Sequence, residues 1–319
     1  AQYLATGMLA LTTFRYMYVV AFHDGLTEAH GIHDLYDVVN EGNWTMEYLK
    51  AATKDIYLDD GNTQRDENDV YGFVSGTRTS VDPFWAGLKL YLVRKDADNY
   101  YSVDLNANQE RLIKGVDRII DLFWDCEGTY TIPYHKDNVD NAAIATMFAG
   151  NKAVFATMKV AAIETRLSAE AQNYGILPFP KFDTQQESYG SYVQDQVTVA
   201  SIPSNATRSD LSEAVLEYLA YQSYLTTYYA YYETALSYRY LQNPESKAML
   251  DLIYASATYD LVFQNMVMEF GTTQMREVID AGYNDMATKL ATVKKDLPSR
   301  VDRINQLFRK LQTDAHGSD

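Results

Sequence analysis

The segment TKDIYLDDGNTQRDENDVYGFVSG, residues 53–76, contains the change of pattern that decides the fold class. Its first residues complete an amphipathic helical repeat that begins after Thr45, a residue type that caps helix N-termini. A polar, acidic loop follows at residues 58–69, and residues 70–74 then have the apolar composition of a β-strand. A helix, a loop and a strand in this order indicate an α/β protein.

The same alternation continues along the chain, with helices in excess. In addition to 70–74, we expect one or two strands within 1–22, and further strands at 153–157, 174–180 and 197–202. The expected helices are 35–39, 46–56, 84–90, one from Asn106 or Asn108 to 123, 138–150, 161–171, a tyrosine-rich pair at 209–240, 244–257, and 272–312 with a break at Pro298. This pattern favours a mixed or parallel sheet with helices on its faces.

Composition excludes several classes of protein. The 319 residues are enough for about two domains at roughly 150 residues each. A net charge of −16 would repel a phosphate backbone or an anionic membrane, so we expect no nucleic-acid partner. The single cysteine, Cys126, excludes an intramolecular disulfide. The apolar stretch 4–22 contains Thr6, Thr12, Thr13 and Arg15, so it does not predict a transmembrane helix.

Motifs for phosphate loops and serine-hydrolase nucleophiles are absent, whereas tyrosine is abundant. The 27 tyrosines offer flat apolar rings with a hydroxyl, which suit sugars and peptides. Nine of them lie between Tyr218 and Tyr240. This run is either a helix seam that packs on a core or, around Tyr229 to Glu233, the border of a ligand cleft.

The acidic loop has the composition of a calcium site, with Asp60, Asn62, Asp66 and Asp69 as weak candidate ligands. A twelve-residue calcium loop ending at Asp69 would need an oxygen ligand at its first position and glycine at its sixth. Leu58 and Thr63 occupy those positions. We therefore expect a solvated turn, with no metal and no cofactor.

Four segments together resemble bacterial extracellular solute-binding proteins of ABC importers, in their carbohydrate-type branch. They are GNWTMEYLKAATK (42–54), the segment 53–76, NYGILPFPKFDTQQESYGSY (173–192) and AVLEYLAYQSYLTTYYAYYETALSYRYLQNPESKAMLDLIYASATYDL (214–261). Their order and spacing agree with that family over roughly residues 1–265. The resemblance implies a non-enzymatic, helix-rich α/β protein of the type II periplasmic-binding-protein-like fold, whose two lobes close on a solute.

The resemblance also implies how the chain is divided. Residues 1–15 correspond to a crossover strand, 16–190 and 245–319 to the second lobe, and 195–240 to a remnant of the first lobe. The lipoprotein signal and most of the first lobe have no counterpart here, so we expect a truncated or processed product, or a missing fragment. The family is found at the cell surface as a lipoprotein or in the periplasm.

Carried over position by position, the expected ligand contacts come from the crossovers and the cleft rim. They are Thr12, Thr13, Trp85, Thr157, Met158, Tyr189, Tyr192, Gln194, Tyr232 and Glu233. Trp85 and Tyr192 are the expected stacking platforms, and Gln194 and Glu233 the partners of solute hydroxyls. The resemblance implies a monomer that captures an oligosaccharide or related solute and delivers it to a membrane permease.

Two other functions fit the residues. A glycoside-active enzyme would use paired carboxylates and consume the sugar. An acidic interaction module would dock a basic partner in a salt-sensitive way. The solute itself is open, since Arg15, Arg94 and Arg239 could meet an anionic group.

Overall fold

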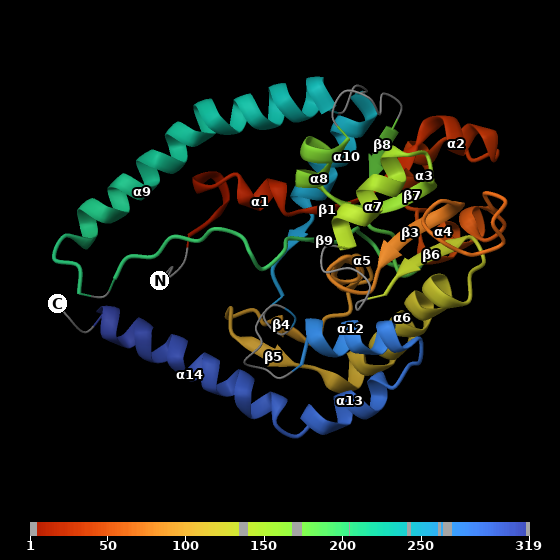
Figure 1. The fold of residues 1–319 in the computed structure, drawn as a ribbon. Helices are drawn as coiled ribbons and strands as arrows, with labels where there is room; N and C mark the ends of the chain where they lie inside the picture. The colour runs from red at the N-terminus through yellow and green to blue at the C-terminus, as the bar shows by residue number, and fades with distance from the viewer. Residues whose placement is uncertain are drawn as a thin grey trace.

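A computed structural model describes residues 5–133, 140–167, 174–203, 205–240, 244–260, 263 and 270–316, with the backbone alone at 106, 107, 140, 141, 233–240 and 314–316. The outer ends of two expected helices, 138–139 and 168–171, lie outside the described residues. Figure 1 shows a β-sheet with helices around it, and two long helices that extend away from the sheet. These two are α9 (Ser209–Ser223) and α14 (Leu297–His316).

The sheet is mixed, as the alternation of strands and helices predicts. Its strands lie in the order β2-β3-β7-β1-β8, and β6 also pairs with β3. Their bounds are β1 Tyr18–His23, β2 Tyr57–Leu58, β3 Val70–Gly76, β6 Thr129–Ile132, β7 Ala153–Lys159 and β8 Tyr174–Leu177. Strand β3 is parallel to β6 and β7, whereas β1 is antiparallel to β7 and β8.

The two central strands are mostly apolar because both of their faces are covered. Residues 18–22 of β1 and 153–158 of β7 are all buried, which is typical of strands between two helical layers. The covering helices include α4 (Met46–Thr53), α6 (Leu105–Trp124), α7 (Asp140–Ala149) and α10 (Pro244–Ala255). The sheet and these helices therefore form the core of the protein (Figure 1).

Most expected helices are present, and one cap confirms its signal directly. The side chain of Thr45 accepts a hydrogen bond of 3.2 Å from the backbone N–H of Tyr48 at the start of α4. The remaining helices are α2 Asp24–Ala29, α3 Leu35–Asn40, α5 Asp82–Gly87, α8 Val160–Arg166, α12 Thr272–Ala281 and α13 Met286–Val293. None of the helices within the described residues has the length and apolar character needed to cross a membrane.

The strand prediction for residues 1–22 was wrong in part, and the one for residues 197–202 was wrong. From residue 5 the N-terminal segment forms a 3-10 turn, η1 (Gly7–Leu9), and a short helix, α1 (Thr12–Arg15), and becomes a strand only at Tyr18. Residues 197–202 form no strand, although Ala200 makes one antiparallel bridge with Ala5. An alternating apolar pattern becomes a strand only where a partner backbone continues beside it.

The prediction of a helix pair in the tyrosine-rich segment was also wrong, because residues 209–240 form one continuous segment. Helix α9 passes without a turn into a wider π-helical segment, η2 (Tyr224–Tyr240). Helix α6 begins before both candidate asparagine caps. Pro298 does not break a helix but lies in the first turn of α14, where a missing N–H costs nothing.

The backbone crosses twice between the sheet and α9, through residues 5–17 and 193–200, which we call the crossing segments. They run antiparallel, with bridges that join Met17 to Val193 and Ala5 to Ala200. The two hydrogen bonds between Ala5 and Ala200 measure 2.9 and 2.8 Å. Two small sheets flank the core, one from β4 (Val93–Lys95) and β5 (Tyr101–Val103), the other from β9 (Ser191–Tyr192) and β10 (Ala257–Thr258).

A buried carboxylate holds the acidic loop between β2 and β3. Asp69 is fully buried and accepts hydrogen bonds from the backbone N–H of Asp60 (3.0 Å) and Asp66 (3.2 Å). The hydroxyls of Tyr57 and Tyr71 also donate to it, at 3.2 and 3.1 Å. Burial acts to raise the pKa of Asp69, but these four donors bind the ionised form and bring the pKa below its ordinary value of 3.8.

We predict that Asp69→Asn lowers the free energy of unfolding at pH 7 and flattens its dependence on acid pH. A carboxyl whose pKa is depressed by folding stabilises the protein above its unfolded pKa, and this contribution disappears as the pH falls through the folded pKa. Urea unfolding at pH 7, 5 and 3 measures the effect. The exposed Asp55→Asn is the control, and equal pH profiles for the two variants would contradict the prediction.

We predict that Phe155→Ala lowers the free energy of unfolding by about 3–5 kcal/mol, because it empties a site at the centre of the sheet. Phe155 is fully buried in β7, with its ring centroid 5.8 Å from that of Trp44. Chemical denaturation gives the value. Leu307→Ala, at a side chain that is 56 % exposed, should change it by less than about 0.5 kcal/mol. Similar losses in both variants would refute this account of the core.

Candidate functional site

Helix α5 packs against β9, directly before the return crossing segment, and two of the predicted ligand contacts, Trp85 and Tyr192, meet there. We call Trp85, Tyr192 and Gln194 the crossover cluster. The approach is close because residue 190 is glycine, where a Cβ would lie 2.2 Å from the carbonyl oxygen of Ala86. A larger residue at this position would push β9 away from α5.

Ring contacts connect Trp85 and Tyr192, two of the three residues of the crossover cluster. Trp85 stacks on Phe263 with ring centroids 4.5 Å apart and an interplanar angle of 22°. Tyr192 meets the same Phe263 edge-on at 5.6 Å and lies 6.0 Å from Tyr18 of β1. Gln194 follows Tyr192 by two residues along an extended backbone, so both side chains leave on the same side.

Polar atoms of the crossover cluster are buried without partners. Trp85, Tyr192 and Gln194 are 1 to 3 % exposed. Within the described part of the chain, the indole Nε1 of Trp85, the hydroxyl of Tyr192 and Oε1 of Gln194 have no hydrogen-bond partner. Such atoms are uncommon in native interiors, because each one costs free energy unless it is paired. Three such atoms lie on the residues of the crossover cluster.

A buried ion pair lies beside the crossover cluster, and no local sequence pattern predicts it. Nε of Arg276, on α12, donates to Oδ1 of Asp82 on α5 at 2.8 Å, and its Nη2 donates to Oδ2. Asp82 is fully buried. Burial acts to lower the pKa of Arg276, but the hydrogen bond and the charge of Asp82 raise it overall. The guanidinium therefore stays charged and neutralises the carboxylate.

The environment keeps Tyr192 neutral. Burial, followed by the charges of Asp82 and Asp195, raises the pKa of its phenol. A neutral phenol both donates and accepts a hydrogen bond. Its unpartnered hydroxyl can therefore bind either end of a hydroxyl group on a ligand.

The other predicted contacts in the core and the crossing segments lie apart from this cluster. Thr157 is buried in β7 and its hydroxyl is 3.0 Å from that of Ser75, while Met158 is buried opposite Val19 of β1. The hydroxyl of Thr12 accepts from the backbone N–H of Thr198 at 2.9 Å, and that of Thr13 is 3.3 Å from Thr6. The two hydroxyls of α1 thus bind other parts of the protein.

Tyr189 and Tyr232 are also engaged within the protein. The hydroxyl of Tyr189 donates to the carbonyl of Val39 at 2.9 Å. Tyr232 is 1 % exposed, hydrogen-bonds Asp251 through its hydroxyl and packs on Phe14 at 5.8 Å. The side chain of Glu233 lies outside the described residues. The structure therefore brings together the two predicted stacking platforms, and Gln194, a predicted hydroxyl partner, follows Tyr192 by two residues.

The run of tyrosines divides into two parts. Tyr228 and Tyr232 stack on each other at 5.1 Å and contact Phe14, so this end is a packing seam. Toward α9 the rings face outward, with Tyr218 61 % and Tyr221 57 % exposed. One helix thus carries both a buried and an exposed aromatic face.

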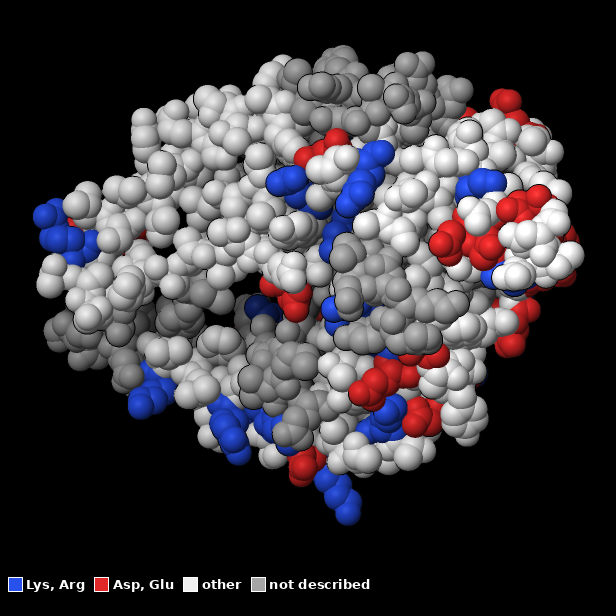
Figure 2. Space-filling model, in the orientation of Figure 1, with Lys and Arg blue, Asp and Glu red and all other residues white. Residues whose placement is uncertain are grey.

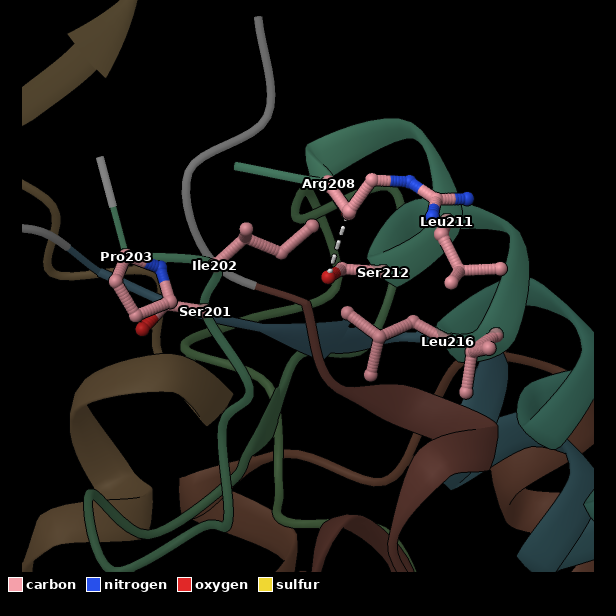
Figure 3. Close-up of a pocket in the computed structure, with 8 residues that line it drawn as sticks. Ser201, Ile202, Pro203, Arg208, Leu211, Ser212 and Leu216 are labelled. Carbon is pink, nitrogen blue, oxygen red and sulfur yellow. Dashed lines mark hydrogen bonds between the residues drawn. The ribbon is translucent and has the colours of Figure 1, made fainter. Parts of the chain in front are cut away.

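An apolar pocket of about 380 Å³ lies at the start of α9 (Figure 3). Residues 201–203 form one wall, and Leu211, Val215 and Leu216 form the other. Figure 3 shows Ile202 and Leu216 on opposite sides of it, with Ser212 hydrogen-bonded to the carbonyl of Arg208. None of the predicted ligand contacts lines this pocket.

The acidic loop brings three of its candidate metal ligands together. Oxygen atoms of Asp60, Asp66 and Asp69 lie within 4.8 Å of one another, and the side-chain amide of Asn62 donates to Asp66 at 3.1 Å. Figure 2 shows acidic side chains gathered on the side of the molecule that carries α2 and α4. Asp69 already accepts four hydrogen bonds within the protein, so the loop is held by its own donors.

Comparison with solved structures identifies the type of fold. No protein-family model matches the sequence, and no curated protein matches it either. Solved structures do match the fold. UgpB from Mycobacterium tuberculosis, in complex with glycerophosphocholine, has a TM-score of 0.57 at 12 % identity over 90 % of this chain and 69 % of its own.

Two further structures give similar values. An ABC transporter solute-binding protein from Agrobacterium radiobacter K84, in complex with ribitol, has a TM-score of 0.53 at 15 % identity over 88 % of this chain and 69 % of its own. The cyclic α-maltosyl-1,6-maltose binding protein from Arthrobacter globiformis has a TM-score of 0.53 at 13 % identity over 90 % and 70 %. The chain therefore has the mixed, helix-rich α/β fold of the two-lobed periplasmic-binding-protein type.

Proposed function

We propose that the protein is the solute-binding component of an ABC importer and binds a neutral, polyhydroxylated solute at the crossover cluster. The observation that carries this proposal is the set of buried, unpartnered polar atoms on Trp85, Tyr192 and Gln194. The similar structures are ABC transporter solute-binding proteins rather than enzymes, and two of them hold ribitol and glycerophosphocholine. The sequence resemblance to the carbohydrate-type branch points the same way.

The chemistry of the crossover cluster suits a sugar or polyol. Such a molecule presents C–H surfaces that pack on aromatic rings and hydroxyls that both donate and accept. The indole N–H of Trp85 donates, Oε1 of Gln194 accepts, and the neutral phenol of Tyr192 does either. Because Arg276 already neutralises Asp82, that carboxylate is not poised for acid–base chemistry, so binding without turnover is the function that fits.

Binding by closure of two lobes requires that the site lie at the crossovers. We assign 16–190 and 245–319 to one lobe and 195–240 to the other, with 1–15 in the connection. Tyr192 and Gln194 are then on the return connection, where a relative rotation of the lobes changes what surrounds them. A closed, loaded form would deliver an oligosaccharide or smaller polyol to a membrane permease.

We predict that a sugar or polyol raises the melting temperature and that Tyr192→Phe weakens its binding by about three- to tenfold, the value of one hydrogen bond. The variant removes a hydroxyl that has no partner among the described residues, so the melting temperature of the free protein should not fall. A thermal-shift panel of polyols, mono- and oligosaccharides, followed by calorimetric titration, measures both quantities.

The matched control is Tyr71→Phe, since the hydroxyl of Tyr71 is buried but shares its proton between the carbonyl of Asp66 at 2.8 Å and the carboxylate of Asp69 at 3.1 Å. It should lower the melting temperature of the free protein and leave the dissociation constant unchanged. Unaltered binding by Tyr192→Phe would assign Tyr192 to the core. Failure of every sugar and polyol to bind, or recovery of a hydrolysed sugar, would refute the proposed function.

A further inference from the structure

A second pocket lies beside β10 and the residues that precede β9. Its volume is about 580 Å³, and its lining includes the polar side chains of Lys89, Tyr91, Arg94, Ser188, Ser256 and Thr258. Tyr189, a predicted ligand contact whose hydroxyl donates to the carbonyl of Val39, also lines it. Leu252 and Ala255, at the end of α10, supply apolar surface. We call it the basic pocket. The tertiary fold forms it, because its walls come from the segment after α5, the loop before β9, and α10 with β10.

The charge of the basic pocket is opposite to that of the protein. The chain has 43 acidic and 27 basic residues, yet Lys89 and Arg94 are the charged residues of this lining. Within the described part of the chain neither of them forms an ion pair. The carboxylate that acts on Lys89 belongs to Glu187, which does not line the pocket. Two cations thus share one concave surface without an acidic partner in it.

Lys89 occupies a backbone position that favours glycine. Its φ is +52°, in the left-handed region, directly after the end of α5, where a helix commonly continues into glycine. A lysine there costs free energy that glycine would not. The side chain lines the pocket, where Nζ donates to the hydroxyl of Ser188 at 2.6 Å.

The environment of Lys89 is short of negative charge. Burial, followed by the charges of Arg111 and Arg94, lowers the pKa of its ammonium group. The acceptor of the hydrogen bond from the Lys89 ammonium group, the Ser188 hydroxyl, is neutral. A bound anion would relieve both the desolvation and the repulsion, since charge-assisted hydrogen bonds are the stronger kind.

We propose that the basic pocket binds a phosphate-sized oxyanion, either free or carried by a small solute, through Lys89, Arg94 and the hydroxyl of Ser188. Lys89 and Arg94 supply the charge. Ser188 accepts from Lys89 and can give its own proton to an anion oxygen. The site is separate from the crossover cluster, since none of the residues that line it belongs to that cluster.

The test is a titration of the whole chain with inorganic phosphate, glycerol 3-phosphate and glycerol at low and constant ionic strength, followed by calorimetry and melting temperature. Phosphate and glycerol 3-phosphate distinguish the two sources of the anion, and glycerol should have no effect. Lys89→Gln with Arg94→Gln should weaken phosphate binding by about tenfold or more. The control pair Lys295→Gln with Arg303→Gln removes two exposed cations and the same charge, and should leave binding intact.

A second variant separates binding from folding. Lys89→Gly relieves the left-handed backbone, so the melting temperature without phosphate should not fall while the response to phosphate is lost. No response of the natural chain to either phosphate compound would overturn the proposal. An equal loss in the control pair would also overturn it. Binding of neutral sugars should be unchanged in all these variants, so the outcome is independent of the function proposed above.

Discussion

The antiparallel contact between the two crossing segments is the constraint on which the rest of the structure depends. In addition to the bridges at Met17 and Ala5, the backbone N–H of Gln194 donates to the carbonyl of Tyr16 at 3.1 Å. This pairing sets the register of the return segment against β1. Because side chains alternate along an extended chain, the register turns Tyr192 and Gln194 to one side and Val193 to the other.

The same register sets how β9 packs against α5. Gly190 lets β9 approach the carbonyl of Ala86, and Trp85 and Tyr192 then share Phe263. The bidentate contact from Arg276 neutralises Asp82, so the helix can be buried with its charge. The unpaired atoms of Trp85, Tyr192 and Gln194 depart from the general rule that buried polar groups are hydrogen-bonded.

Two places of different chemistry, the crossover cluster and the basic pocket, lie close to strand β9. One is neutral, aromatic and rich in unpaired donors and acceptors, and the other concentrates positive charge in a strongly acidic protein. Figure 2 shows acidic side chains over α2 and α4 on one face of the molecule. The basic pocket differs from that face, because the charged residues of its lining are Lys89 and Arg94.

The sequence by itself determined what depends on neighbours along the chain. The cap at Thr45, the strand at Val70–Gly76 and the central strand β7 all follow from local patterns, and the resemblance led to Trp85, Tyr192 and Gln194. Only the tertiary structure decided the rest. Residues 197–202 have the pattern of a strand but lack a continuous partner, and the pair of Asp82 and Arg276 joins residues 194 positions apart. No local pattern encodes such contacts, because they exist only after the chain has folded.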